Sequence, residues 1–386
     1  MLKIWIIYIF SLLYVTAWAG NNEIESVNRI LGSVGKKYAP DKRTALFDVS
    51  FIERSTLIVL KGKTNLPQAR QMVLDSLNLL KIDYQDSMIV LPDYTVGEKI
   101  WGLATLSVAN MRSAPDHASE LVSQALMGTP VKVLQVVDGW YYIQTPDLYL
   151  GWVDENGIAL KTEAEMALWK QAKRFVFNQP TGTAENIPKR NASPVSDLVM
   201  GDMFEVISKE RKYLQVKFPD GRTAFIKKSD CISYEEWITQ KPDVKDVLAT
   251  AKELLGTAYL WGGTSCKAVD CSGMIKTAWY AEGVILARDA SQQAMYGEKI
   301  DFTNRENLKP GDLLFFGRNA QRIIHVGIYM GNGRYIHASG LVRINSIDQN
   351  DLLYNITERK KLVGAIRIIS SLGTEGIVFV KEHGWY

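Results

Sequence analysis

The sequence predicts an α+β protein made of several domains, and three observations support this prediction. The last third combines apolar residues at helical spacing, at 274–279, with two apolar strands that flank a glycine-rich turn at 331–333. The middle third holds two matching segments of short alternating strands, which begin near Met127 and Met200. The first part of the chain mixes both patterns. Helices that pack against antiparallel strands are typical of the α+β class.

Length and composition narrow the class of protein. A chain of 386 residues with 47% hydrophobic residues has room for about two to four globular domains. Its net charge of +3, without a basic cluster, argues against a dedicated binder of nucleic acid or of a membrane surface. The sequence also lacks zinc-finger spacing and a phosphate-binding glycine loop. We therefore expect no nucleic-acid partner.

Residues 1–19 have the pattern of a signal peptide. Lys3 supplies a positive start, residues 4–15 are almost wholly apolar, and Ala-Trp-Ala at 17–19 is a cleavage site. A retained membrane anchor is the alternative, but the apolar run is shorter than the ~20 residues that span a bilayer. No cysteine follows the cleavage site, so we expect no lipid anchor. The expectation is an exported protein, periplasmic or secreted, whose mature chain starts near Gly20 and is not inserted in a membrane.

Residues 20–100 are predicted to form a small α+β domain. Its first helix is marked by apolar residues at helical spacing, namely Ile24, Val27, Ile30 and Leu31. Strands are expected at 46–53, 56–60 and 88–91. A second helix, capped by Thr64 or Asn65, precedes the last strand. This domain shows no catalytic pattern, and we expect it to pack on and orient the rest.

Residues 101–235 contain an internal repeat that aligns without a gap. Its short strands, such as 131–134, 140–144 and 150–153, predict two small β-barrels at 101–160 and 175–240. A helix is expected to link them within 161–174. These strands resemble those of bacterial SH3-like domains. Such a barrel can bind peptidoglycan, act as a spacer, or wall off a catalytic cleft.

Cys271 lies in an Asp-Cys-Ser-Gly stretch just before the predicted helix of the last third. Backbone N–H groups at a helix N-terminus are unpaired and favour an anion. The position therefore predicts a lowered thiol pKa and a nucleophilic cysteine. The alternative is a small cysteine buried against the helix.

His325 and His337 lie on the two strands of a predicted hairpin. A three-residue loop centred on Asn332 would pair residue 325 with 339 and residue 337 with 327, so that both histidines share a face. One could then serve as the base for Cys271 and the other could orient it. A two-residue turn would place them on opposite faces, and two unrelated polar strand residues are the alternative.

Five stretches together resemble the NlpC-type, papain-like cell-wall cysteine peptidases. They are Tyr-Leu-Trp-Gly-Gly at 259–263, Asp-Cys-Ser-Gly at 270–273, Leu-Lys-Pro-Gly-Asp at 308–312, His-Val-Gly-Ile-Tyr at 325–329, and His-Ala at 337–338. The resemblance covers about residues 243–370, within an expected catalytic domain at 241–386. It implies Cys271 as nucleophile, His325 as base and His337 as the orienting residue. It also implies that Tyr259 lies near the oxyanion site.

The resemblance further implies a substrate site shared between domains. Glu120 and Tyr149 of the first barrel match positions that close the cleft in narrow-specificity relatives, although Glu120 alone can be a solvated loop carboxylate. The catalytic domain would contribute Trp261, Asp270, Ser272, Asp289 and Ser291. Ala290 separates the last two residues, where the family can place the Ser directly after the Asp, so this sequence departs from the family pattern at Ser291. Glu120, Asp270 and Asp289 would bind a substrate amine.

The other two cysteines suggest alternatives. Cys231 aligns with Ile158 in the repeat and is expected in a core. Cys266 could form a disulfide with Cys271, which would silence the nucleophile. A zinc site from both of these cysteines with His325 and His337 matches no known ligand spacing.

The implied function is a cysteine peptidase that needs no metal or organic cofactor. Its expected substrates are peptidoglycan stem peptides or muropeptides, cleaved between γ-D-glutamyl and a diamino acid such as diaminopimelate or lysine. With a free N-terminal L-Ala, the product would be L-Ala-γ-D-Glu, and a monomer is expected. The alternatives are a general wall endopeptidase or lysin, an amidase or acyltransferase with the same thioester chemistry, and an inactive wall-binding protein.

Overall fold

The structure is a computed structural model that describes residues 22–386 except 55–56 and 190. The predicted signal peptide lies outside the described residues. The chain divides into two compact units, residues 1–97 and 98–386. Within the described ranges, no helix is long and apolar enough to cross a membrane.

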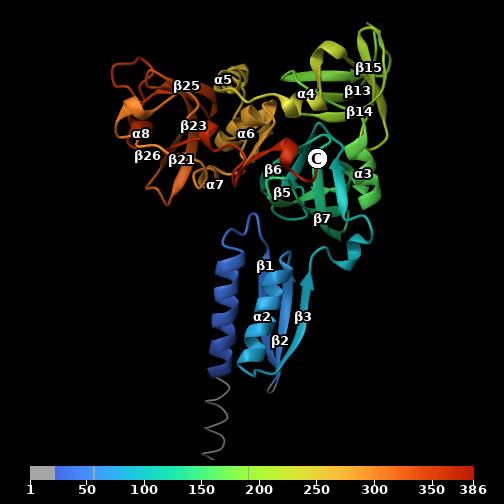
Figure 1. The fold of residues 1–386 in the computed structure, drawn as a ribbon, viewed down its shortest axis with the longest axis vertical. Helices are drawn as coiled ribbons and strands as arrows, with labels where there is room; N and C mark the ends of the chain where they lie inside the picture. The colour runs from blue at the N-terminus through green and yellow to red at the C-terminus, as the bar shows by residue number, and fades with distance from the viewer. Residues whose placement is uncertain (1–21, 55–56, 190) are drawn as a thin grey trace, which may run out of the picture. The chain divides into compact units, whose positions relative to one another are not determined.

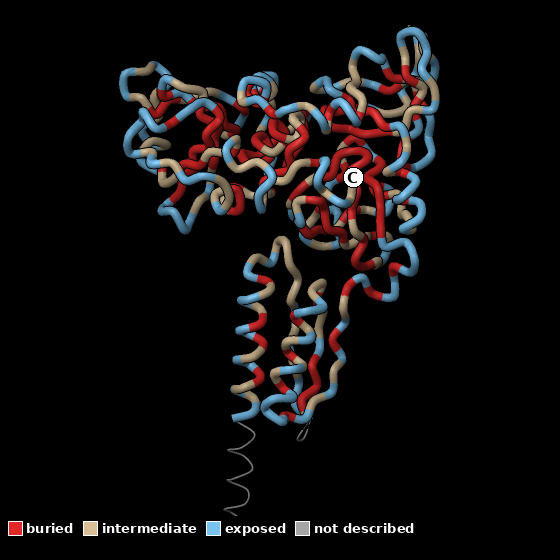
Figure 2. The backbone as a smooth tube through the Cα atoms, viewed as in Figure 1, coloured by how far each residue is buried: buried red, intermediate tan, exposed pale blue. Residues whose placement is uncertain are grey.

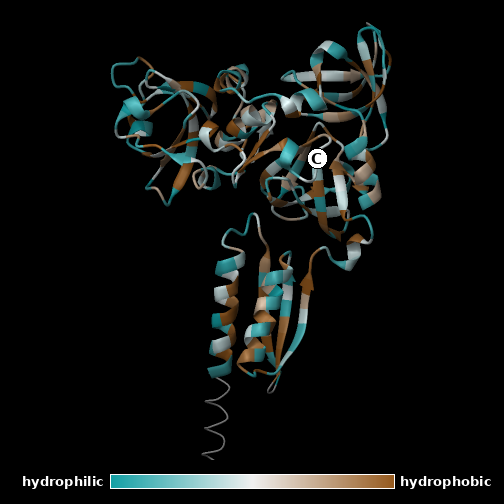
Figure 3. Cartoon of the chain, viewed as in Figure 1, coloured by the Kyte–Doolittle hydropathy of each residue, from teal (hydrophilic) through white to brown (hydrophobic). Residues whose placement is uncertain are grey.

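The N-terminal unit is a helix over residues 22–38 followed by a ββαβ arrangement (Figure 1). Its further elements are β1 (Phe47–Arg54), β2 (Leu57–Thr64), α2 (Pro67–Leu79) and β3 (Tyr84–Val90). The sheet has the order β1-β2-β3, with β1 antiparallel and β3 parallel to β2. Both helices alternate hydrophilic and hydrophobic residues (Figure 3), and their buried residues Val27 and Val73 pack in one core with Leu60.

The cap of α2 differs from the prediction. The residue before the helix is Leu66, whose side chain makes no capping hydrogen bond, and Pro67 opens the first turn. Proline suits this position because its fixed φ is helical and its missing N–H is not needed there. The hydroxyl of Thr64 instead donates to the carbonyl of Leu46, and the Asn65 side chain accepts from the Leu46 N–H.

Two seven-stranded sheets with the same topology follow (Figure 1). The first has the order β10-β4-β7-β8-β9-β5-β6 and consists of β4 (Trp101–Ala104), β5 (Val108–Arg112), β6 (Leu121–Leu126), β7 (Pro130–Val137), β8 (Trp140–Gln144), β9 (Leu150–Asp154) and β10 (Ile158–Lys161). The second has the order β17-β11-β14-β15-β16-β12-β13 and consists of β11 (Arg174–Phe177), β12 (Thr181–Glu185), β13 (Pro194–Val199), β14 (Met203–Lys209), β15 (Tyr213–Lys217), β16 (Thr223–Lys227) and β17 (Cys231–Ser233). The matching order explains the repeat in the sequence.

The helix α3 (Glu163–Gln171) connects the two sheets, with Thr162 as its N-cap in a capping box with Glu165. The sheets also contact each other directly. The Met203 N–H donates to the Met127 carbonyl, and the buried carboxylate of Asp202 accepts from the Met127 N–H. Burial raises the pKa of Asp202 well above its usual value. Cys231, expected in a core, is half-buried against the apolar core of the second sheet.

The last part of the chain packs helices against a six-stranded sheet (Figure 1). The sheet has the order β21-β26-β22-β23-β24-β25 and consists of β21 (Glu298–Lys299), β22 (Leu313–Gly317), β23 (Ile323–Gly331), β24 (Arg334–Ser339), β25 (Leu341–Ser346) and β26 (Leu362–Arg367). The helices of this part are α5 (Val244–Glu253), α6 (Cys271–Ala281), α7 (Ala290–Gln293) and α8 (Ile356–Arg359), whereas α4 (Tyr234–Thr239) contacts β11 and β17 of the second barrel sheet. Trp279 of α6 packs with Phe315 and Ile328 of the sheet in one core. Figure 2 marks many residues of this part of the chain as buried. The predicted α+β class is confirmed.

Short pairs of strands complete this part of the chain. They are β18 (Thr264–Ser265) with β19 (Ala268–Val269), and β20 (Val284–Leu286) with β27 (Ile377–Phe379). Because β20 follows α6, the pairing with β27 holds the segment after β27 beside the end of the helix, where the Val380 N–H donates to the Gly283 carbonyl.

The register of the β23–β24 hairpin agrees with the prediction. Ile328 pairs with Ile336, which is the register that would set residue 325 opposite 339. The two histidine rings are in contact, with centroids 4.9 Å apart. His325 and His337 therefore share a face, as expected.

The predicted three-residue loop of this hairpin is wrong. Only Asn332 and Gly333 lie in the turn, and both have positive φ, at 52° and 80°. This is the conformation that Asn-Gly hairpin turns prefer. A register shift between Tyr329 and Gly331 adds one residue to β23, which is a β-bulge. The bulge compensates for the shorter turn, so the shared face survives.

Candidate active site

Cys271 is the first residue of α6, as the sequence predicted. Asp270 is the N-cap, and its carboxylate accepts from the Gly273 N–H at 2.7 Å. A Cβ atom at Gly273 would lie 2.0 Å from the Gly263 carbonyl oxygen, so only glycine fits at this position. The Asp-Cys-Ser-Gly stretch thus packs the start of the helix directly against the preceding loop. The Cys271 side chain is buried there, with 7% of its surface exposed.

The two histidines form a hydrogen-bonded pair next to this cysteine. The Nε2 of His325 and the Nδ1 of His337 are 2.7 Å apart. The Val326 N–H, next to His325 in the chain, hydrogen-bonds the Cys271 sulfur. Nε2 of His325 is thus the ring nitrogen that His337 engages. The arrangement groups one thiol with two imidazoles, which are side chains of the kind that nucleophilic catalysis uses.

The first barrel contacts the same region through two hydrogen bonds between side chains. Glu120 Oε1 accepts from the indole N–H of Trp261 at 2.7 Å, and the Tyr149 hydroxyl donates to Asp289 Oδ2 at 3.0 Å. The backbones also lie close together, since a Cβ atom at Gly262 would be 2.4 Å from the Leu121 carbonyl oxygen. Residues from two domains therefore border one site.

Comparison with known proteins agrees with this geometry. Residues 256–360 match the NlpC/P60 family, and residues 111–158 match the bacterial dipeptidyl-peptidase Sh3 domain. The chain is 34% identical over 232 residues to the gamma-D-glutamyl-L-lysine dipeptidyl-peptidase of Bacillus subtilis. The matched residues make up 56% of this chain and 71% of that protein. The chain belongs to the NlpC/P60 family.

Further similarities extend over the barrels. The dipeptidyl-peptidase 6 of Lysinibacillus sphaericus is 29% identical over 282 residues, which cover 69% of this chain and 97% of that protein. The crystal structure of an NlpC/P60 family protein from Bacillus cereus superposes with a TM-score of 0.60 at 22% identity, covering 69% of this chain and 99% of the other. This last similarity concerns the fold alone. The chain is a cysteine peptidase of the NlpC/P60 family.

The expected lowering of the Cys271 pKa is not found in this NlpC/P60 site. Burial of the thiol raises its pKa to about 12, and the Asp270 carboxylate raises it further, against smaller opposing effects of the Val326 and Ser272 N–H groups. Burial likewise lowers the pKa of His325 to about 4 and that of His337 to about 3. In the unliganded site, the thiol and both imidazoles are therefore neutral at pH 7. The helix terminus was correctly located, but desolvation outweighs its dipole.

Asp270 differs from its expected role at the substrate amine. Its Oδ2 accepts from Arg288 at 2.6 Å and from the Gly262 N–H at 3.0 Å. Its Oδ1 accepts from the Gly273 N–H and lies 3.2 Å from the Ser272 hydroxyl. Both oxygens are thus satisfied by the protein, and the charge is paired. Of the three predicted carboxylates, Asp270 is the one that Arg288 binds most closely, whereas Asp289 lies 3.8 Å from the same guanidinium and Glu120 accepts from Trp261.

Arg288 is the residue of this site that the sequence did not reveal. It is 1% exposed and also donates to the Ser123 hydroxyl of the first barrel and to the Ser272 hydroxyl, both at 3.1 Å. Its guanidinium lies 3.8 Å from the Asp289 carboxylate. The one signal was a charged residue two positions after the end of the apolar strand β20, but its partner Asp270 lies on another element.

The remaining predicted residues lie nearby. Tyr259 is half-buried, and its pKa is raised to about 12 by burial and then by the charges of Cys271 and Asp270. Asp289 precedes α7, and its N–H donates to Gln292 at 3.0 Å. Ser291 is half-buried in the first turn of α7.

Neither cysteine alternative has a structural basis among the described residues. All three cysteines are free thiols, so Cys266 and Cys271 are not bridged. In the part of the chain that the structure describes, no three His, Cys, Asp or Glu side chains are grouped to hold a metal ion.

The pKa of Cys271 predicts how the resting enzyme reacts with iodoacetamide. Because the thiolate is the reactive form and its pKa is raised to about 12, the thiolate fraction grows with pH. The rate constant for loss of activity should rise about tenfold per pH unit between about pH 6 and 9. Mass spectrometry should map the label to Cys271, and a rate that is already flat at pH 6 would contradict the neutral resting pair.

Replacement of Arg288 by Met should destabilise the protein strongly. The change leaves the 9% exposed side chain of Asp270 without its cation. We expect the free energy of unfolding in urea to fall by about 3–5 kcal/mol. The control is Lys217→Met, which removes an ion pair with Glu205 whose side chains are 46% and 28% exposed, and it should cost less than about 1 kcal/mol. Similar small losses in both variants would show that Arg288 is dispensable.

Proposed function

We propose that this chain is a dipeptidyl-peptidase that releases L-Ala-γ-D-Glu from peptidoglycan stem peptides with a free N-terminal L-Ala. The bond cleaved is the one between γ-D-glutamyl and the diamino acid, diaminopimelate or lysine. The proposal rests mainly on the contacts of Glu120 with Trp261 and of Tyr149 with Asp289. In this proposal, Glu120 and Asp289 supply carboxylates at one end of the site. The side chains of the first barrel form a wall there, which limits how much substrate fits beyond that end.

In the proposed reaction, the Cys271 sulfur attacks the γ-carbonyl carbon of D-Glu. Since the thiol starts neutral, its proton passes to Nδ1 of His325 as the S–C bond forms, and Nε2–H remains donated to His337. The oxyanion accepts hydrogen bonds from the Cys271 N–H and the Tyr259 hydroxyl. His325 then gives its proton to the leaving amine, and water hydrolyses the thioester to free the dipeptide and regenerate the thiol.

The amine requirement follows from electrostatics. An ammonium group taken out of water costs several kcal/mol unless a carboxylate meets it. Glu120 and Asp289 are candidate partners, while Asp270 is occupied by Arg288. A site built around this pairing rejects the same peptide when its amine is blocked. Such an enzyme acts after an amidase, on released fragments, in recycling of the wall.

The signal-like residues 1–19 support the further proposal that the enzyme is exported, and we expect it to act as a monomer. Two other activities remain as outcomes of the tests below. One is a general endopeptidase on intact peptidoglycan, and the other is an amidase or acyltransferase that uses the same thioester.

The catalytic roles predict a graded series of losses. Cys271→Ala should abolish release of dipeptide, and His325→Ala should be nearly as severe. His337→Asn should be milder, because an orienting group contributes less than the base. Mass spectrometry of products from defined muropeptides measures this, with circular dichroism to confirm folding. Hydrolysis by a folded Cys271→Ala variant would refute the mechanism, and a transferred acyl group in the wild-type products would indicate the acyltransferase.

The amine site predicts a strong preference between two substrates. L-Ala-γ-D-Glu-diaminopimelate should be cleaved with a kcat/KM at least about 100-fold above that of its N-acetylated form, because the blocked amine leaves a carboxylate unpaired. Glu120→Gln should reduce this ratio. The control is Glu155→Gln, at the residue that follows β9, and it should leave the ratio unchanged. Equal rates in the wild type would indicate a general wall endopeptidase.

A further inference from the structure

The loop between β8 and β9 of the first barrel contacts α6, the helix that begins with Cys271. It contains Thr145 to Tyr149 and is closed by two hydrogen bonds, Leu148 N–H to the Thr145 carbonyl at 2.8 Å and Thr145 N–H to the Tyr149 carbonyl at 3.0 Å. The Thr145 hydroxyl donates to Asp147 at 2.5 Å. Within this short turn, the positions of Asp147 and Tyr149 are therefore linked.

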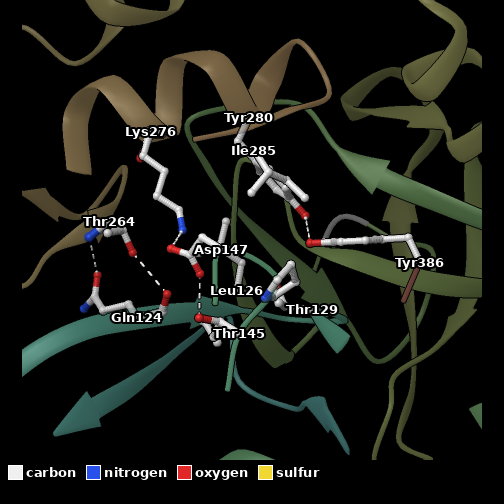
Figure 4. A pocket seen from close by; sticks show the side chains of 13 residues that line it. Gln124, Leu126, Thr129, Thr145, Asp147, Thr264, Lys276, Tyr280, Ile285 and Tyr386 are labelled. Carbon is white, nitrogen blue, oxygen red and sulfur yellow. Dashed lines mark hydrogen bonds and ion pairs between the residues drawn. The ribbon is translucent and has the colours of Figure 1, made fainter. Parts of the chain in front are cut away.

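Asp147 forms a buried ion pair with Lys276 of α6, which Figure 4 shows reaching down from the helix. The two side chains are 1% and 16% exposed. Burial alone would raise the pKa of Asp147, but the Lys276 ammonium and its hydrogen bond outweigh this and lower it. Lys276 follows Cys271 by five residues, about 7.5 Å along the helix axis. The pair thus ties the turn to the helix that carries the nucleophile.

The other end of the turn lies at the substrate side of the site. The Tyr149 hydroxyl donates to Asp289 at 3.0 Å. A third contact fixes the middle of the turn, because the Nε2 of His383 lies 3.0 Å from the Pro146 carbonyl oxygen. Three contacts with residues outside the first barrel therefore hold the turn.

The second barrel provides an internal comparison. Its corresponding turn, residues 218–222, is closed by the same two hydrogen bonds, at 2.9 Å each. The aspartate at the matching position, Asp220, pairs only locally with Arg222, and these side chains are 28% and 40% exposed. The turn itself thus forms without a buried partner. The pairing of Asp147 with Lys276 must serve something other than the shape of the turn.

The backbone of the first turn supports this conclusion. Leu148 adopts a φ of 65°, where the matching residue of the second barrel is Gly221 with a φ of 91°. A left-handed conformation is unfavourable for leucine and free of this penalty for glycine. The first turn keeps its conformation although its sequence favours it less, and its outside contacts hold it there.

We propose that the Asp147–Lys276 ion pair is a positioning device that sets Tyr149, and through it Asp289, at a fixed distance from Cys271, so that the free amine of the substrate is read. Both residues of the pair act through Tyr149 and do not touch the substrate. This inference rests on the proposed function, since it assigns the amine preference to the geometry of that site.

The test compares Asp147→Asn with the matched change Asp220→Asn in the second barrel. Active enzyme is counted by titration of Cys271, and kcat and KM are measured for L-Ala-γ-D-Glu-diaminopimelate with and without N-acetylation. Asp147→Asn should raise KM for the free-amine substrate and lower the preference for it by about tenfold or more, because small misplacements of binding groups are costly. Asp220→Asn should change neither. An unchanged preference in folded Asp147→Asn overturns the proposal.

A double-mutant cycle with Tyr149→Phe distinguishes the positioning role of Asp147 from a purely structural one. If Asp147 acts through Tyr149, Asp147→Asn should lower the preference no further in the Tyr149→Phe background. An equal further loss overturns the proposal. If Asp147→Asn does not fold, Lys276→Gln decides, because it removes the other charge of the pair and leaves every residue of the turn in place. A lower preference then supports the proposal and an unchanged one overturns it.

The same measurements keep the two levels of inference apart. A wild-type enzyme that cleaves neither peptide refutes the proposed function, and this inference with it. A wild type that prefers the free amine, together with a Tyr149→Phe variant that loses the preference and an Asp147→Asn variant that keeps it, refutes the positioning role alone.

Discussion

The catalytic part of the molecule depends on one buried carboxylate, that of Asp270. It caps the helix that begins with Cys271, accepts from the Gly262 N–H of the preceding loop, and pairs with Arg288 before the loop of Asp289. A buried carboxylate is tolerated only when its oxygens are hydrogen-bonded and its charge is paired. The Asp270 carboxylate bonds to the start of α6, to the loop of Gly262 and to Arg288. It therefore sets the position of Cys271 together with the positions of the two neighbouring loops.

Close backbone contact makes this arrangement possible. A side chain at Gly273 would collide with the Gly263 carbonyl, and one at Gly262 with the Leu121 carbonyl of the first barrel. Gly262 also has a φ of 81°, a left-handed conformation that suits glycine. The glycines of the Trp-Gly-Gly and Asp-Cys-Ser-Gly stretches are therefore packing requirements. They bring the loop, the helix and the barrel close enough for Asp270 to bond to all its partners.

What could be predicted from the sequence was what local patterns determine. Periodicity located α6 with Cys271 at its start, and a loop centred on Asn332 predicted the β23–β24 register that puts both histidines on one face. The bulge after Tyr329 could not be foreseen, since a shorter turn plus one extra residue gives the same register. The Asp270–Arg288 pair joins separate elements and has no local pattern. The thiol pKa depends on burial, which only the assembled domains produce.

The contacts between the first barrel and the catalytic helix and loops are strongly polar, and this has a consequence for how the site is held. Lys276 pairs with Asp147, Trp261 with Glu120, and Gln124 bonds Thr264 through both its side chain and its carbonyl. Apolar packing stabilises an interface but is non-directional, whereas hydrogen bonds and ion pairs fix register and orientation. The second copy of the barrel shows that the same turn forms without such partners. The directional contacts of the first copy therefore add orientation to a turn that the second copy forms without them.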